Sequence, residues 1–155
     1  MRQLGTMMAL VAALGCGGSS GGQGTGGTCP IPVARTAPTF SGDILPALQA
    51  SCGAATSTCH GTAAPAGHVE YATGGGRTAS DVWRDLVNAV PANAPPGWLR
   101  VAPYDVSRSW LIEKITKDQP GGSGFGARMP YGGANVCQPT VDTLVTWIDQ
   151  GAPND

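Results

Sequence analysis

Apolar side chains recur at helical spacing in four stretches of this chain. The first stretch predicts a helix over residues 42–52, where Ile44, Leu48 and Cys52 follow one another at intervals of four and therefore share one face. This spacing places the Cys52 thiol at the C-terminal end of the buried face.

The three later stretches predict three further helices. One is expected over residues 80–90, with Ser80 as its N-cap, and the next over residues 107–117. The last has Pro139 in its first turn and ends at Gly151. The apolar faces of these helices are formed by Val82, Leu86, Val87 and Val90, by Trp110, Leu111, Ile112 and Ile115, and by Val141, Leu144, Val145 and Ile148.

Two long loops, residues 53–79 and 119–138, separate these helices. Loops of this length are unusual inside a small domain unless they wrap around something or carry function. The pattern therefore predicts a small all-α domain with long loops over residues 39–155.

The N-terminus has the layout of an export signal. Arg2 precedes a short apolar run over residues 7–14, which is too short to span a bilayer as a helix. The next residues, ALGC, resemble the lipobox of bacterial lipoproteins. This resemblance implies that residues 1–15 are a signal peptide and that Cys16 carries a lipid. The alternative is an ordinary signal peptide cleaved nearby, which leaves a soluble exported protein.

A linker over residues 16–38 joins the expected lipid site to the domain. Its first part, GGSSGGQGTGGT, has no apolar residue and is typical of a flexible tether. Its second part, CPIPVARTAP, is rich in Pro and expected to be extended. We therefore expect a domain held at a membrane of the cell envelope, facing the periplasm or the cell exterior.

Charge and motif content exclude several classes of function. The formal net charge is -1 and charged residues make up 12% of the chain, so no basic surface is available for nucleic acid. The sequence contains no plausible Ser-His-Asp set, phosphate-binding loop or pair of patterned carboxylates. We therefore expect neither nucleic-acid binding nor independent enzymatic activity.

Export changes what the cysteines can do, because thiols outside the cytoplasm are oxidised or covalently occupied. With Cys16 lipidated, four cysteines remain: Cys29, Cys52, Cys59 and Cys137. Four cysteines allow three disulfide pairings, and the sequence alone does not choose among them.

Cys52, Cys59 and His60 form the main candidate site. Covalent haem attachment uses two thiols that form thioethers and an adjacent imidazole that binds the iron, commonly as C-x-x-C-H. Here six residues separate Cys52 from Cys59. Closing a longer loop costs only about 0.6 kcal/mol for each doubling of its length, so the wider spacing is thermodynamically mild.

Met129 is a candidate second ligand for the iron. It is the only methionine outside residues 1–15, and it lies in the Gly-rich loop GFGARMPYGG instead of on an apolar helix face, where it would read as core. A His/Met pair is an axial ligand set of electron-transfer cytochromes c.

From residue 39 onward the chain resembles the small cytochrome-c-like domains of exported bacterial proteins. The resemblance rests on five segments in order: SGDILPALQASC, then CHG at Cys59, then VAP with SWL, then MPYGG at Met129, and finally WIDQGA. It implies a cytochrome-c-like fold, with haem c attached to Cys52 and Cys59 and ligated by His60 and Met129. It also implies single-electron transfer to a redox partner protein in the envelope.

If haem occupies Cys52 and Cys59, we expect Cys29 and Cys137 to form a disulfide. That bond would pin the N-terminal arm near the start of the last helix.

Three alternatives stay open. A Cys52–Cys59 disulfide would give a haem-free, cytochrome-like lipoprotein that acts as a binding module. A zinc site would use Cys52, Cys59, Cys137 and either His60 or His68. His68 could also replace Met129 as the second ligand of the iron.

Overall fold

A computed structural model describes residues 29–53, 59–61 and 69–155 of the chain. These residues form four α-helices and no β-strand, so the expectation of a small all-α domain with loops between its helices is confirmed for them. The helices are α1 (Leu45–Cys52), α2 (Ala79–Leu86), α3 (Trp110–Thr116) and α4 (Gln138–Asp149). No helix in this part of the chain is long and apolar enough to cross a membrane.

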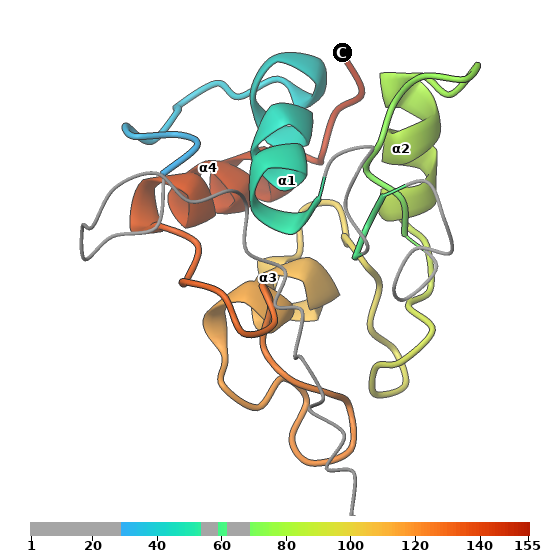
Figure 1. The fold of residues 1–155 in the computed structure, drawn as a ribbon, viewed down its shortest axis with the longest axis vertical. Coiled ribbons are helices and arrows are strands. Elements are labelled where there is room, and N and C mark those ends of the chain that lie inside the picture. Colours follow the sequence, from blue (N-terminus) through green and yellow to red (C-terminus); the bar gives the residue numbers. More distant parts are fainter. Residues whose placement is uncertain (1–28, 54–58, 62–68) are drawn as a thin grey trace, which may run out of the picture.

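α4 runs behind α1 in the view of Figure 1, and α3 lies below both. The Trp147 indole on α4 is fully buried and stacks on Phe40, with 5.5 Å between the ring centroids. Phe40 begins a π-helical turn, Phe40–Ile44, that leads directly into α1. This aromatic contact therefore fixes α1, and with it Cys52, relative to α4.

α2 begins earlier than the sequence predicts. Its N-cap is Thr78 and not Ser80, because Thr78 forms a capping box with Asp81. The Asp81 amide donates to the Thr78 hydroxyl at 3.3 Å, and the Thr78 amide donates to the Asp81 carboxylate at 2.9 Å. Two amides at the start of the helix are satisfied in this way.

α2 also ends four residues before the predicted boundary at residue 90, so the prediction was wrong there. Val87 leaves the helix in an extended conformation and forms a parallel bridge with Val101. Asn88 then takes a positive φ of 58° and donates its amide to the Val101 carbonyl at 2.9 Å. The chain turns away from the core, which leaves Val90 74% exposed.

α3 is shorter than expected at its N-terminal end, because a separate 3₁₀ turn occupies Val106–Arg108. The buried Ser109 hydroxyl separates the two elements by donating to the Asp105 carbonyl at 2.9 Å and accepting the Ala102 amide at 2.9 Å. The predicted core of α3 is confirmed, since its four apolar residues are buried: Trp110, Leu111, Ile112 and Ile115.

The N-terminal arm, residues 29–36, lies along α4. A disulfide joins Cys29 to Cys137, the pair expected from the sequence, with the two Cα atoms 5.4 Å apart. Beyond it, the Ile31 amide donates to the Thr140 hydroxyl at 3.2 Å and the Arg35 amide donates to the Thr143 hydroxyl at 3.0 Å. The arm is thus held by one covalent bond and by side chains of α4.

The disulfide should contribute strongly to stability. Replacing both Cys29 and Cys137 by Ser is expected to lower the free energy of unfolding by about 2–4 kcal/mol, because the bond closes a long loop in the unfolded chain. Urea denaturation of the two proteins measures the difference. Thr143→Val, which removes an arm hydrogen bond but keeps the disulfide, should cost less. Equal unfolding free energies for the parent and the double variant would contradict the expectation.

Candidate functional site

A cavity of about 290 Å³ opens between the C-terminal end of α1, α3 and the loop at residues 125–129. Its volume lies near the lower end of the range for ligand sites. Most of its wall is apolar, and no Asp or Glu is among the described residues that line it. The polar side chains in the wall are Cys52, His60, Tyr71, Asn93, Arg100 and Lys114.

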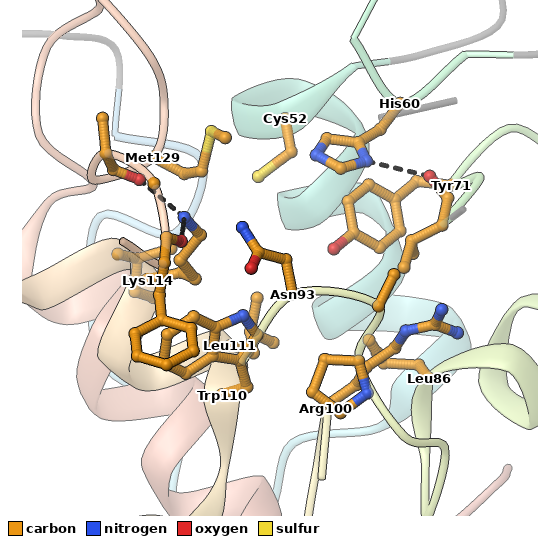
Figure 2. A pocket seen from close by; sticks show the side chains of 17 residues that line it. Cys52, His60, Tyr71, Leu86, Asn93, Arg100, Trp110, Leu111, Lys114 and Met129 are labelled. Atoms are coloured by element: carbon orange, nitrogen blue, oxygen red, sulfur yellow. Dashed lines mark hydrogen bonds between the residues drawn. The ribbon is translucent and has the colours of Figure 1, made fainter. Parts of the chain in front are cut away.

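His60 lies at one side of the cavity and is oriented by the segment that follows it. Its Nδ1 atom is 2.8 Å from the Val69 carbonyl oxygen, and its own carbonyl accepts the Tyr71 amide at 3.0 Å. A proton on Nδ1 is donated to Val69, which makes Nε2 the electron-pair donor of the ring. Figure 2 shows this edge of the imidazole turned toward Cys52 and Met129.

The protonation state of His60 suits a metal ligand. Burial lowers the pKa of this imidazole, and the hydrogen bond to the Val69 carbonyl opposes the shift only in part. Because the ordinary pKa is already 6.5, the ring is neutral at pH 7. Neutral imidazole is the form that coordinates metals.

Met129 approaches the cavity from the other side. It is partly buried against the core, and its amide donates to the Lys114 carbonyl of α3 at 2.7 Å. In Figure 2, Cys52 lies between Met129 and His60. The structure therefore brings a thioether, a thiol and an imidazole from three separate segments to one cavity.

Cys52 is a free, buried thiol in the cavity wall. Burial raises its pKa to about 12, so the sulfur is protonated at neutral pH. Cys59 is disulfide-bonded, and its partner lies outside the described residues. The alternative of a Cys52–Cys59 disulfide is therefore wrong, because α1 carries the Cys52 sulfur into the apolar core.

The structure does not assemble the zinc site considered above. Cys137 is bonded to Cys29 and cannot act as a thiolate ligand. Among the residues described, no group of three His, Cys, Asp or Glu side chains could hold a metal ion. His68 and the expected lipid site Cys16 lie outside the described residues.

Tyr71 and Lys114 are two of the cavity residues that were not predicted from the sequence. Tyr71 is buried, its ring lies 5.0 Å from the His60 ring, and Figure 2 shows its hydroxyl pointing into the cavity. Lys114 borders the cavity from α3 and contacts the Met129 segment. Tyr71 lies within the predicted loop 53–79, where no periodicity indicates a buried side chain. Lys114 could have been predicted to share a helix face with Trp110, because it follows Trp110 by four residues.

The buried Cys52 thiol should make the haem-free domain less stable at alkaline pH. Its pKa rises from an ordinary 9.0 to about 12 on folding, so between these values the unfolded chain releases a proton that the folded domain keeps. This contribution to stability is complete below pH 9 and falls by about 1.4 kcal/mol per pH unit above it.

Cys52→Ala should remove this part of the pH dependence, as measured by urea denaturation at increasing alkaline pH. Burial is the main cause that raises the pKa of Tyr71 as well, with a smaller contribution from the charge of Cys52, so only the part due to burial is common to both proteins. The same slope of unfolding free energy against pH in parent and variant would show that Cys52 is not buried in this way.

No protein-family model matches the chain, and no curated protein or solved structure is significantly similar to it.

Proposed function

We propose that this chain is a covalent haem-binding, electron-transfer domain of an envelope lipoprotein. The observation that carries the proposal is the meeting of His60, Met129 and Cys52 at one apolar cavity. Imidazole and thioether are the axial ligands of many electron-transfer haems. A free thiol in the same wall provides a point of covalent attachment.

The chemistry of the cavity fits a porphyrin. Its wall is mostly apolar, which suits the macrocycle, and the described lining has two cationic residues, Arg100 and Lys114, but no carboxylate. A porphyrin with acidic side chains would meet no like charge from these residues. When bound, haem supplies an iron that accepts and releases one electron.

Each residue has a separate role in holding the group. His60 binds through Nε2, and the Val69 carbonyl fixes the ring orientation by accepting the Nδ1 proton. Met129 would bind through its sulfur from across the cavity. Cys52 would hold the group covalently, since a thiol can add across a vinyl group to give a thioether.

Cys59 is the second expected anchor, and it must first become a thiol. Its disulfide has to be reduced by a dithiol, which is itself oxidised to a disulfide as it supplies two electrons and two protons. The lone free thiol at Cys52 would otherwise give attachment through a single thioether.

The compartment is part of the proposal. The Cys29–Cys137 disulfide favours an oxidising compartment, in keeping with an exported protein. Lipidation of Cys16 would hold the domain at a membrane, where it meets a redox partner protein of the envelope.

A haem-free binding module is the second candidate function. The disulfide at Cys59 favours it, because a disulfide-bonded cysteine forms no thioether. In this case the cavity would take another apolar ligand, and the Cys29–Cys137 bond would be the covalent link between the described arm and the start of α4.

Haem staining after denaturation separates the two candidates. The full chain, made in a host with active c-type haem attachment, is expected to show a Soret band and a haem stain that survives a denaturing gel. Cys52→Ala should reduce the stain strongly, whereas the Cys29→Ser and Cys137→Ser double variant should retain it as a matched cysteine control. A colourless parent protein would contradict the haem proposal and favour the binding module.

Met129 has its own test. Met129→Leu should keep the covalent haem but lower its midpoint potential, because a thioether ligand raises the potential of a His-ligated haem. The thioether-to-iron charge-transfer absorption of the oxidised protein should also disappear. Spectroelectrochemical titration measures both effects. An unchanged potential and spectrum would assign the second axial position to another residue.

A further inference from the structure

The segment that presents Met129 has little structure of its own. It forms no helix or strand between residues 119 and 133, and much of it is exposed. The glycines at 122, 124 and 126 all take positive φ values, so the backbone follows an irregular path. The position of Met129 at the cavity must therefore come from contacts outside the segment.

Lys114 of α3 provides three of these contacts. Its ammonium donates to the Ala127 carbonyl at 2.7 Å and to the Phe125 carbonyl at 3.3 Å. Its own carbonyl accepts the Met129 amide at 2.7 Å. One residue thus binds every second residue of the stretch 125–129, and Figure 2 shows the ammonium lying against this stretch.

The surroundings of Lys114 favour hydrogen bonds from its ammonium to the loop carbonyls. Its Nζ atom lies 5.6 Å from the centre of the Trp110 ring, and the Phe125 ring packs edge-on against the same indole. Within the described part of the chain, no carboxylate forms an ion pair with Lys114. Backbone carbonyls of the loop are therefore the acceptors of the ammonium.

Gly126 allows the Lys114 ammonium to approach the backbone of the loop closely. It has a φ of +84°, and a Cβ atom at this position would lie 3.3 Å from the Lys114 Nζ atom. A side chain here would crowd the ammonium and strain the backbone. The loop is therefore shaped to receive the ammonium between Phe125 and Ala127.

We propose that Lys114 is the positioning residue for Met129: its ammonium and carbonyl hold residues 125–129 against α3 so that the Met129 sulfur faces the cavity. The part played by Met129 as an iron ligand rests on the proposed function. The attachment of the segment to α3 is a property of the chain itself and can be tested without haem.

The haem-free test is tryptic cleavage after Arg128, within the held stretch. Lys114→Met keeps the aliphatic stem but removes the donors, and it should raise the initial rate of this cleavage about tenfold, since charge-assisted hydrogen bonds closing the segment are lost. Lys117→Met is the matched control, because Lys117 is exposed at the end of α3 and its loss also removes one tryptic site. Its cleavage rate after Arg128 should match that of the parent.

Gly126→Ala tests the contact between the Lys114 ammonium and the loop by changing the loop side. This variant should also accelerate cleavage after Arg128. Circular dichroism of each variant verifies that α-helical content is kept. An unchanged rate in both Lys114→Met and Gly126→Ala would overturn the attachment of the segment by Lys114.

The haem-loaded test is competition by imidazole for the position of Met129. Lys114→Met should raise the apparent affinity for imidazole about tenfold, because the competing sulfur is held less firmly. Lys114→Arg, which keeps a cationic donor, should give an intermediate affinity for imidazole. Lys117→Met should leave the affinity of the parent unchanged. Faster cleavage without any change in imidazole affinity would overturn the positioning role. A parent protein that takes up no haem would refute the proposed function, while the cleavage rates still decide whether Lys114 holds the segment.

Discussion

The burial of Trp147 is the constraint on which the rest of the domain depends. Its ring is fully excluded from solvent and stacks on Phe40 at the start of the first helical segment. Its Nε1–H donates to the Pro153 carbonyl at 3.1 Å, and its backbone carbonyl accepts the Ala152 amide at 2.9 Å. The chain end is thereby folded back onto the core, where the Ala152 carbonyl accepts the Trp83 indole at 2.8 Å. One side chain connects α4 to α1 and, through the tail, to α2.

The cavity is a result of this arrangement. α1 is fixed at its N-terminal end by Phe40, so its other end, with Cys52, projects over the space beside α3. α3 supplies Lys114 at the opposite wall. Two short helices placed in this way leave a hollow that the loops carrying His60 and Met129 complete. Side chains that are far apart in the sequence meet because the helices are short and the loops long.

The parts of the fold that could be predicted from sequence are those set by local periodicity. The core of α3 and the bounds of α4 follow from apolar spacing, with Pro139 near the start of α4 and Gly151 after its end. The end of α2 could not be predicted, because Val87 leaves the helix to pair with Val101, a contact that no local pattern encodes. Residue chemistry pointed to Cys52, Cys59, His60 and Met129, of which Cys52, His60 and Met129 line one cavity while Cys59 is disulfide-bonded. The Tyr71 contact with His60 and the Lys114 contacts with the loop depend on tertiary packing, so they became visible only in the structure.

The placement of the arm on α4 also determines how the domain would carry mechanical load. A pull applied at Cys29, where the described part of the chain begins, passes through the disulfide to Cys137, immediately before α4. Farther along, the Thr140 and Thr143 hydroxyls and the Gln150 amide bind successive points of the arm. The covalent bond comes first in this path, so it takes the tension before any hydrogen bond does. Force entering at Cys29 would therefore be passed to α4, which contributes no residue to the cavity wall, before it reaches the helices that line the cavity.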